Sequence, residues 1–316
     1  MNRLSDYQEK FRKLVVNVRA GRPSPHKICM LLALLDLARS GSFGRNRVQF
    51  GPALLERYMR FFASVKGPSD HANPYFPFFH LAGRLRDGGD SFWHLRPIPG
   101  REAVLVAMST ARSFRDITDN IDWAEVDAEL FQLLQDPPNI DALAETISRH
   151  WLDRGLEDLR AVVAESSRVS GYEYALRSGL LLQDRESPVP AYVRDSAFRR
   201  VVTQIYDYRC AASGLRIVLP TGQAMVQAAH IHPFSEAGDD DPRNGIALTP
   251  DMHWAMDTNL IAPGPDFRWH VSTVIDERIP DFARLLELRG KPLFLPQEPR
   301  FHPKLEVLEW RRDRLR

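Results

Sequence analysis

Residues 227–257 contain three histidines, one asparagine and five aspartates, and four of these side chains are spaced so that they could do chemistry together. They are His230, Asn244, His253 and Asp257. His253 and Asp257 are four positions apart, so a helix would place both on one face. A neutral imidazole can remove a proton from water, and a divalent cation can neutralise charge on a phosphate ester and on its leaving oxygen. The pattern therefore suits metal-assisted hydrolysis of a phosphodiester.

The sequence predicts a strand, a loop, a second strand and a helix to position these groups. The stretch AMVQAAHIHPF ends a strand at His230, and EAGDDDPRNG forms the loop that carries Asn244. In LTPDMHWAMDTN, Thr249 and Pro250 mark the start of a short helix. This order is expected to bring His230 opposite the helix face that carries His253. An asparagine in the loop can fix its geometry without adding charge, which would otherwise shift the pKa of the histidine.

The segments CAASG, AAHIHPF, DPRNGIALTPDMHWAMD and FRWHVS resemble the HNH nucleases, which have the ββα-metal fold. Their spacing is similar to that of the subgroup without a structural zinc. The resemblance implies that His230 is the general base and that Asn244 braces the loop. It also implies that His253 binds the metal or contacts the phosphate.

One position departs from this family. Many relatives carry an aspartate or histidine ligand directly before the first histidine, and here that residue is Ala229. The resemblance then implies that Asp257, or Asp251, completes a metal site together with water, as Mg²⁺ tolerates. Mg²⁺ or Mn²⁺ is the expected cofactor, with Co²⁺ or Ni²⁺ as alternatives. Because Cys29 and Cys210 are far apart, a structural zinc with several thiolates is excluded.

Other polar residues of this region have simpler interpretations. His232 is expected to point away from His230, because side chains alternate along a strand. His270 is interpreted as structural. The three aspartates at 239–241 are interpreted as a solvated turn.

Length and composition indicate the class of protein and the number of domains. The chain has 316 residues, of which 44% are hydrophobic and 26% charged, with a formal net charge of +1. This indicates a folded protein of two domains without a global basic field. Neither a signal peptide nor an apolar run of about 18 residues is visible, so we expect a cytoplasmic protein without a membrane span.

The predicted fold class is α+β. A mainly helical DNA-recognition domain with a small hairpin is expected over 1–165, a linker over 166–189, and the HNH nuclease domain over 190–316. HKICMLLALLDLARSG reads as a buried core helix and GPALLERYMRFFASV as another helix. An Asp-Gly-Gly turn between aromatic segments predicts a hairpin within 73–97. Further helices are expected over 123–134 and 141–165.

The N-terminal segments SPHKICMLLALLDLARSG, NPYFPFFHL and SFWHLRP resemble the domain attached to HNH nucleases of the modification-dependent (type IV) restriction class. Its relatives include the sulfur-binding domains that recognise phosphorothioate DNA. Sulfur is softer and less hydrated than a phosphate oxygen, so an apolar cup beside cations can hold it. The residues that the resemblance implies for this site are Tyr75, Phe76, Pro77, His26, Lys27, Arg84 and Arg101.

The sulfur-binding relatives commonly show Tyr-Pro and His-Arg where this chain has Phe76-Pro77 and His26-Lys27. Another modification, or none, therefore remains open. The neighbouring Phe78, Phe79, Phe92 and Trp93 are interpreted as core.

Near the nuclease motif, Arg199 and Arg200 lie on a predicted arginine-rich helix. They are interpreted either as phosphate contacts or as a solvated face.

These expectations combine into a restriction-type endonuclease that acts on double-stranded DNA, with phosphorothioated DNA as the expected target. Because cutting both strands usually needs two active sites, we expect a homodimer at least on DNA. Two alternatives stay open. One is a DNA-binding module whose nuclease domain is inactive, as Ala229 would suggest. The other is an HNH nuclease that cuts unmodified DNA.

Overall fold

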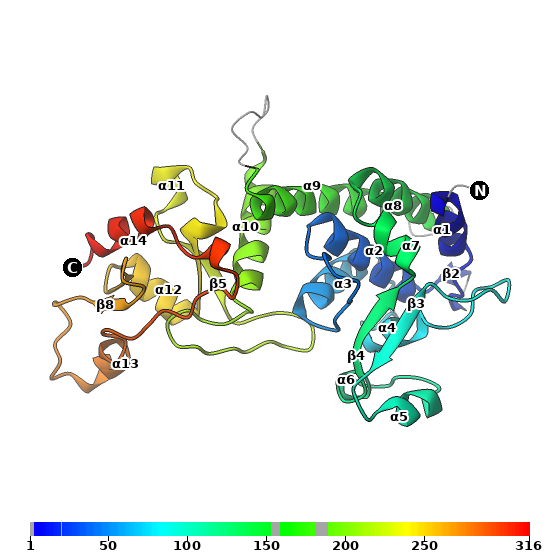
Figure 1. Ribbon diagram of the computed structural model, residues 1–316, viewed down its shortest axis with the longest axis horizontal. Coiled ribbons are helices and arrows are strands. Elements are labelled where there is room, and N and C mark those ends of the chain that lie inside the picture. The colour runs from blue at the N-terminus through cyan, green and yellow to red at the C-terminus, as the bar shows by residue number, and fades with distance from the viewer. Residues whose placement is uncertain (1–2, 20, 153–158, 181–188) are drawn as a thin grey trace. The chain divides into compact units, whose positions relative to one another are not determined.

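The computed structural model describes residues 3–19, 21–152, 159–180 and 189–316 (Figure 1). The chain divides into two compact units, Met1–Tyr174 with Pro220–Gln223, and Ala175–Leu219 with Ala224–Arg316. Within the described residues, helices are combined with small two-stranded antiparallel sheets. The predicted α+β fold class is confirmed.

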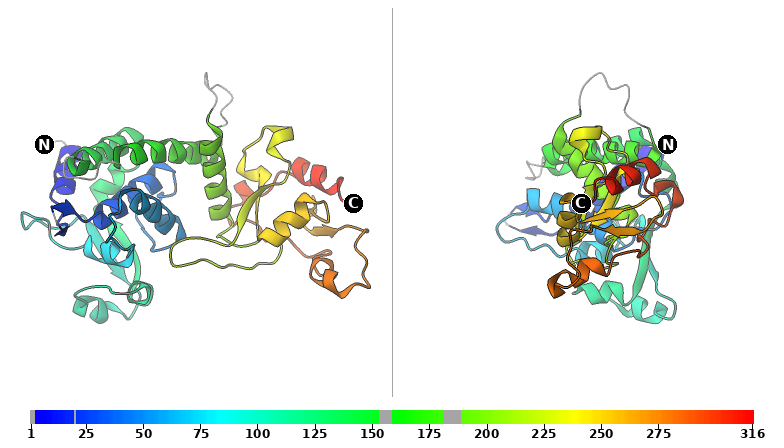
Figure 2. Two further views of the ribbon diagram at one scale, coloured as in Figure 1. Left: turned by 180° about the vertical axis from the view of Figure 1, so that it is seen from behind. Right: turned by 90° about the vertical axis from the view of Figure 1, so that its left-hand side faces the viewer.

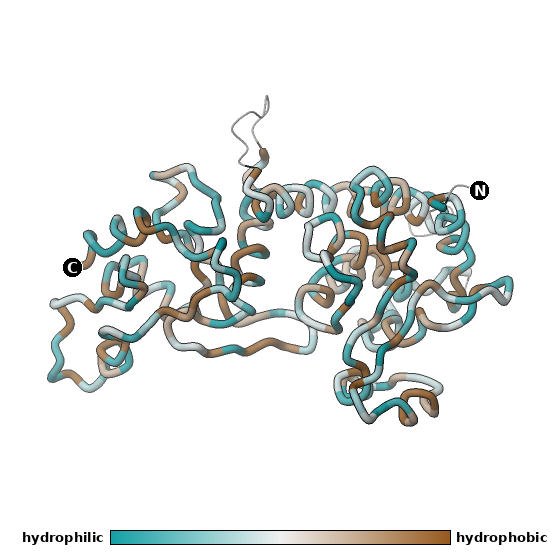
Figure 3. Tube along the Cα trace, viewed as in Figure 1, coloured by the Kyte–Doolittle hydropathy of each residue, from teal (hydrophilic) through white to brown (hydrophobic). Residues whose placement is uncertain are grey.

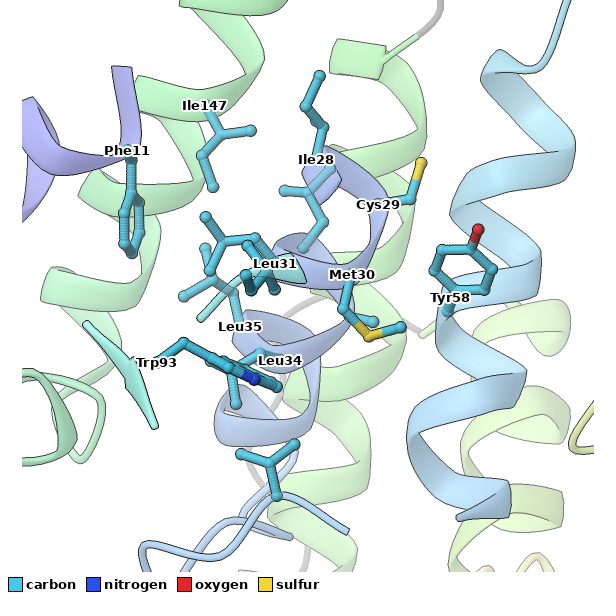
Figure 4. Packing of buried hydrophobic residues seen from close by; sticks show 14 of the residues in the cluster. Phe11, Ile28, Cys29, Met30, Leu31, Leu34, Leu35, Tyr58, Trp93 and Ile147 are labelled. Carbon is cyan, nitrogen blue, oxygen red and sulfur yellow. The ribbon is translucent and has the colours of Figure 1, made fainter. Parts of the chain in front are cut away.

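The first unit is mainly helical. Its elements are α1 (Arg3–Arg12), β1 (Val18–Arg19), β2 (Arg22–Pro23), α2 (His26–Arg39), α3 (Pro52–Val65), α4 (Tyr75–His80), β3 (Trp93–Pro97), α5 (Glu102–Ala107), α6 (Phe114–Thr118), β4 (Ile121–Val126), α7 (Ala128–Leu133), α8 (Pro137–Leu152) and most of α9 (Leu159–Ser178). The helix α2 is buried continuously from Ile28 to Leu37. Figure 4 shows its side chains among Phe11, Tyr58 and Ile147, which come from α1, α3 and α8. The prediction of a buried core helix is confirmed.

The prediction of a hairpin within 73–97 is wrong. Residues 75–80 form the helix α4, and β3 pairs instead with β4, so that Trp93 lies opposite Val126. Pro74 already has helical backbone angles (φ −63°, ψ −28°), and proline is well tolerated where a helix begins. The strand β4 also replaces the start of the helix predicted over 123–134. It pairs with β3, and because these residues are distant in the sequence, local pattern does not reveal the pairing.

The aromatic residues interpreted as core are largely buried. Phe78 and Phe92 have no exposed surface and Trp93 has 1%, while Phe79 is partly buried against the same cluster. The short helix α5 behaves differently. Figure 3 colours it as a hydrophobic segment, yet none of its residues is buried.

Helices continue into the stretch expected as a linker. Instead of one helix over 141–165, α8 ends at Leu152 and α9 extends to Ser178. The polar residues of α9 are partly internal: Glu173 is fully buried, and its Oε2 lies 2.5 Å from Nη2 of Arg57, which also pairs with Asp36. The polar side chains here take part in a buried ion network. Their partners are not visible in the sequence, so this stretch resembled a linker. Residues 181–188 of the expected linker lie outside the described residues.

The second unit contains the end of α9 and the elements that carry the candidate site. They are α10 (Ala191–Ile205), β5 (Gln227–His230), α11 (Phe234–Ala237), η1 (Pro242–Asn244), β6 (Gly245–Leu248), α12 (Pro250–Asp257), β7 (Ile261–Pro263), β8 (Trp269–Val271), η2 (Pro280–Phe282), α13 (Ala283–Leu286), η3 (Pro299–Phe301) and α14 (Leu305–Arg312). The strands β5 and β6 are antiparallel, and both α10 and α12 contact this hairpin (Figures 1 and 2). The predicted order of strand, loop, strand and helix is confirmed.

Two further expectations concern the chain as a whole. None of the helices in the described ranges combines the length and the hydropathy that crossing a bilayer requires. Cys29 and Cys210 are both buried and unbridged.

Candidate active site

His230 is the last residue of β5 and pairs with Gly245 of β6. A Cβ atom at position 245 would lie 2.9 Å from Cζ of Phe198 and would also collide with Val202. Because glycine has no side chain, α10 can approach the hairpin closely. The Phe198 ring then stacks on the imidazole of His230, with ring centroids 3.8 Å apart and an interplanar angle of 3°. This contact fixes the plane of the imidazole.

The loop between β5 and β6 supplies an acidic partner for the same imidazole. Asp240 Oδ1 lies 3.1 Å from Nε2 of His230, and Asp240 Oδ2 accepts a hydrogen bond of 3.3 Å from Nη1 of Arg194. Asp240 is only 8% exposed and Asp241 only 5%. The interpretation of residues 239–241 as a solvated turn is therefore wrong for both aspartates. Nothing in the sequence distinguished Asp240 from its two acidic neighbours.

Asn244 is fully buried and closes the same loop. Its Oδ1 accepts a hydrogen bond from the backbone N–H of His232 at 2.9 Å. Its Nδ2 donates to the backbone carbonyls of His232 at 2.9 Å and Asp239 at 3.0 Å. The side chain thus satisfies three backbone groups that a buried loop would otherwise leave unpaired. It holds the turn that follows His230 in one conformation.

The loop is also fixed by residues from the end of the chain. Asp241 pairs with Arg243 and with Lys304, at 2.7 Å and 3.0 Å. Burial alone would raise the pKa of Asp241, but hydrogen bonds from Arg243 and Lys304 hold that pKa below its ordinary value. His232 stacks on Trp310 of α14 with ring centroids 3.9 Å apart.

Arg311 of α14 connects two parts of the motif. This arginine is 3% exposed, and burial lowers its pKa. Its guanidinium donates to the carbonyl of Ile231, just after β5, at 2.6 Å and to the carbonyl of Met256 in α12 at 3.3 Å. It therefore links the strand that carries His230 to the helix that carries His253.

His253 lies on α12 and has different neighbours from His230. Its Nδ1 lies 3.0 Å from Oε1 of Gln227, and its Nε2 lies 3.3 Å from Oδ2 of Asp257. Because an amide oxygen only accepts hydrogen bonds, Nδ1 donates to Gln227. A metal-binding histidine is usually held in this way, with its second nitrogen bonded to an acceptor.

The donor set on α12 fits a divalent cation held by few protein ligands. His253 and Asp257 are brought together, but Asp251 lies on another face of the helix and pairs with Arg284 at 3.2 Å. Across the described ranges, no three His, Cys, Asp or Glu side chains are clustered so as to hold an ion by themselves. A cation bound here would take its remaining ligands from water and phosphate, which Mg²⁺ permits.

The two histidines are associated with different faces of β5. Gln227, the partner of His253, is three positions from His230, and side chains that far apart on a strand point to opposite faces. The His230 ring is contacted by Phe198, Phe234 and Asp240. The expected approach of His230 toward the His253 face of α12 therefore differs from the arrangement observed.

In the first unit, the predicted DNA-binding residues are partly brought together. The His26 ring nitrogens contact Ser24 Oγ and the carbonyl of His71, both at 2.8 Å. Lys27 is half-buried, and burial lowers its pKa. Burial and then the charge of Lys27 lower the pKa of His80 in α4.

The aromatic part of that expected site lies on α4. Tyr75 and Phe76 are partly exposed, whereas Pro77 is buried. The Phe76 ring packs on His80 with centroids 4.2 Å apart. The remaining predicted cations are placed as follows: Arg84, Arg101 and Arg199 are exposed, and Arg200 is 3% exposed.

The comparison with protein families agrees with the geometry of the second unit. Residues 210–262 match the family described as HNH endonuclease. Among curated proteins, none matches the chain. A solved structure described as a modification dependent TagI restriction endonuclease is similar at 23% identity and a TM-score of 0.31. That similarity covers 41% of this chain and 40% of the other. Residues 210–262 therefore form an HNH endonuclease domain.

Proposed function

We propose that this protein is a metal-dependent endonuclease that hydrolyses phosphodiester bonds in double-stranded DNA, with His230 as the general base. The observation that carries the proposal is the hydrogen bond from His230 to the buried Asp240 inside the matched HNH segment. A histidine held by a carboxylate on one nitrogen can accept a proton on the other. Stacking on Phe198 keeps this ring in place before substrate arrives.

The other predicted residues have supporting roles. Asn244 holds the loop that carries Asp240, through its bond to the Asp239 carbonyl. His253 and Asp257 would hold the divalent ion, which supplies charge neutralisation at the phosphate and the leaving oxygen. We do not assign Asp251 to the metal, because it pairs with Arg284.

We further propose that the first unit selects modified DNA, with a phosphorothioate as the leading candidate. Lys27 is a half-buried cation beside α4, where the aromatic rings of Tyr75 and Phe76 are partly exposed. A cation next to apolar surface suits a soft, weakly hydrated anion better than an ordinary phosphate. Exposed Arg84 and Arg101 would contact the DNA backbone. Cutting of both strands would then involve two copies of the chain.

A cleavage panel tests these proposals. The purified chain is incubated with phosphorothioated, methylated and unmodified plasmids of one sequence, each with Mg²⁺, Mn²⁺, Co²⁺ or Ni²⁺. We expect metal-dependent cutting that favours phosphorothioated DNA and is lost in His230→Ala. His270→Ala is the matched control, since His270 pairs with Asp266 rather than with the site.

The outcomes separate the alternatives. Equal cutting of the three plasmids would reject the modified target and leave a nuclease for unmodified DNA. If wild type and His230→Ala are equally inert with every metal, the domain is an inactive nuclease. The observation that favours this second candidate is Ala229, a buried residue with no donor at the position before His230.

A further inference from the structure

Asp240 and Arg194 form a chain of polar contacts that ends at the candidate base. Asp240 Oδ1 lies at Nε2 of His230, and its Oδ2 accepts from Nη1 of Arg194. The Arg194 guanidinium lies 3.9 Å above the ring of Phe234. We propose that Asp240 and Arg194 are positioning residues that fix the His230 tautomer, so that Nδ1 is the nitrogen that accepts the proton. The catalytic part of this inference rests on the proposed nuclease function.

The donor and acceptor types of the three groups determine the tautomer. An ionised carboxylate only accepts hydrogen bonds, so the Nε2 that faces Asp240 must donate. A neutral imidazole has one proton, and Nδ1 is then left with its lone pair. Arg194 has only donors, and it therefore occupies the second oxygen of Asp240 and orients the carboxylate toward the ring.

Asp240 and His230 also differ in how far solvent can reach their side chains. The Asp240 side chain is 7% exposed, whereas that of His230 is 23% exposed. Water can therefore reach the imidazole while the carboxylate behind it stays shielded. Since Phe198 stacks on the ring face, the ring cannot turn to exchange its two nitrogens without losing this contact.

In the proposed hydrolysis, water and the phosphodiester are the reactants. The oxygen of a water molecule forms a bond to phosphorus, and its proton passes to Nδ1 of His230. The P–O ester bond breaks, and the departing oxygen keeps the electron pair and takes a proton from solvent. Arg194 and Phe198 belong to α10, which lies outside the matched segment 210–262, so the family match does not assign them.

The decisive variant is Asp240→Asn, which preserves shape but changes hydrogen bonding. Arg194 can only donate, so the new amide oxygen will turn toward it and the amide NH₂ will face His230. Nε2 must then accept, and the proton moves to Nδ1, where it blocks the base. We expect cleavage to fall by about 10²- to 10⁴-fold.

Asp240→Ala separates this role from a purely steric one. If Asp240 only filled space, Asp240→Asn would be the more active variant, whereas control of the tautomer predicts that Asp240→Ala is. It removes the bias without imposing the wrong tautomer, so we expect it to retain at least about tenfold more activity than Asp240→Asn. Adding Arg194→Ala to Asp240→Asn removes one donor that orients the amide and should restore part of the loss. Arg216→Ala, which removes an exposed arginine paired with Asp207, is the matched control.

A spectroscopic measurement tests the tautomer without substrate. The full chain is labelled with ¹⁵N-histidine, and the signal of His230 is assigned by its absence in His230→Ala. At a pH where the ring is neutral, we expect a protonated Nε2 in wild type and a protonated Nδ1 in Asp240→Asn. A wild-type ring with its proton on Nδ1 would overturn the inference, as would an Asp240→Asn enzyme more active than Asp240→Ala.

The two proposals can fail separately. If wild type cuts none of the DNA panel, the proposed function fails, while the ¹⁵N spectra still decide the tautomer of His230. If wild type cuts DNA but the spectra show the wrong tautomer, the nuclease stands and the role of Asp240 is rejected.

Discussion

The two faces of β5 are equipped very differently. On one, the His230 imidazole is stacked on Phe198 and bonded to the buried Asp240. On the other, His253 meets Gln227, and its neighbour Asp257 is 57% exposed. The two imidazoles are similarly exposed, at 23% and 25%, but the carboxylate beside His230 is buried and the one beside His253 is open to solvent.

The difference indicates what the protein must arrange before substrate binds. A proton acceptor works only if its ring and tautomer are correct, so rigid contacts at His230 are useful. A cation can complete its coordination with water and phosphate, so the helix face needs only a few ligands. We therefore expect substitutions on the His230 face to lower cleavage activity equally at every metal concentration. Substitutions on the His253 face should lower it by an amount that depends on metal concentration.

The largest effect should come from His230→Ala. Removing the base should lower the cleavage rate by about 10²- to 10⁴-fold at any metal concentration. Rates at saturating DNA across a metal titration measure this. A loss that disappears at high metal would place His230 with the metal ligands and break the comparison.

Substitutions on the other face should instead weaken metal binding. We expect His253→Ala and Asp257→Asn to raise the metal concentration for half-maximal cleavage by about 100-fold, with partial recovery in excess metal. Calorimetric titration of Mn²⁺ into each variant measures the affinity directly. Unchanged affinity in both would exclude them as ligands.

Asn244→Ala should act through structure. It leaves the His232 N–H and two carbonyls without their partner, which costs about 1–3 kcal/mol for a buried unpaired group. Denaturant unfolding should therefore show a lower midpoint, whereas Asn139→Ala in α8 should behave as wild type. An unchanged midpoint in Asn244→Ala would mean that the loop does not depend on this side chain.

Gln227→Ala sharpens the comparison on the open face. It removes the acceptor that orients His253, and we expect a loss of about tenfold in metal affinity with little change at saturating metal. The same titration as for His253→Ala checks this. Equal loss at all metal concentrations would show that Gln227 acts in the chemistry itself.

The smallest effect concerns acid stability. The pKa of Asp241 is lowered in the folded state, so its pairing stabilises the fold above the unfolded value of about 3.9 and is lost as pH falls through the folded pKa. Wild type should therefore lose more stability below about pH 4 than Lys304→Met, whose Asp241 has lost one partner. Parallel acid unfolding curves for the two proteins would argue against this contribution.

The sequence predicted the parts that depend on local pattern. Thr249 and Pro250 signalled the start of α12, and the spacing of His253 and Asp257 placed them on one face. The burial of Asp240 could not be predicted, because it depends on Arg194 in an element 46 positions away. The pairing of β3 with β4 was missed for the same reason, since about thirty residues separate Trp93 from Val126.

The first unit shows the same limit. Its core helix α2 was evident from an almost continuous apolar run. In contrast, the polar composition of α9 suggested a linker, because a sequence does not show that Glu173 has Arg57 as a buried partner. Polar groups whose partners are distant are therefore the least predictable feature in both units.

The contacts of Arg311 have a practical consequence for engineering. A graft of residues 210–262 into another scaffold would leave the Ile231 and Met256 carbonyls without their guanidinium donor. Such a transplant would have to carry α14 with it, or replace that cation, before the grafted motif could be expected to keep its shape.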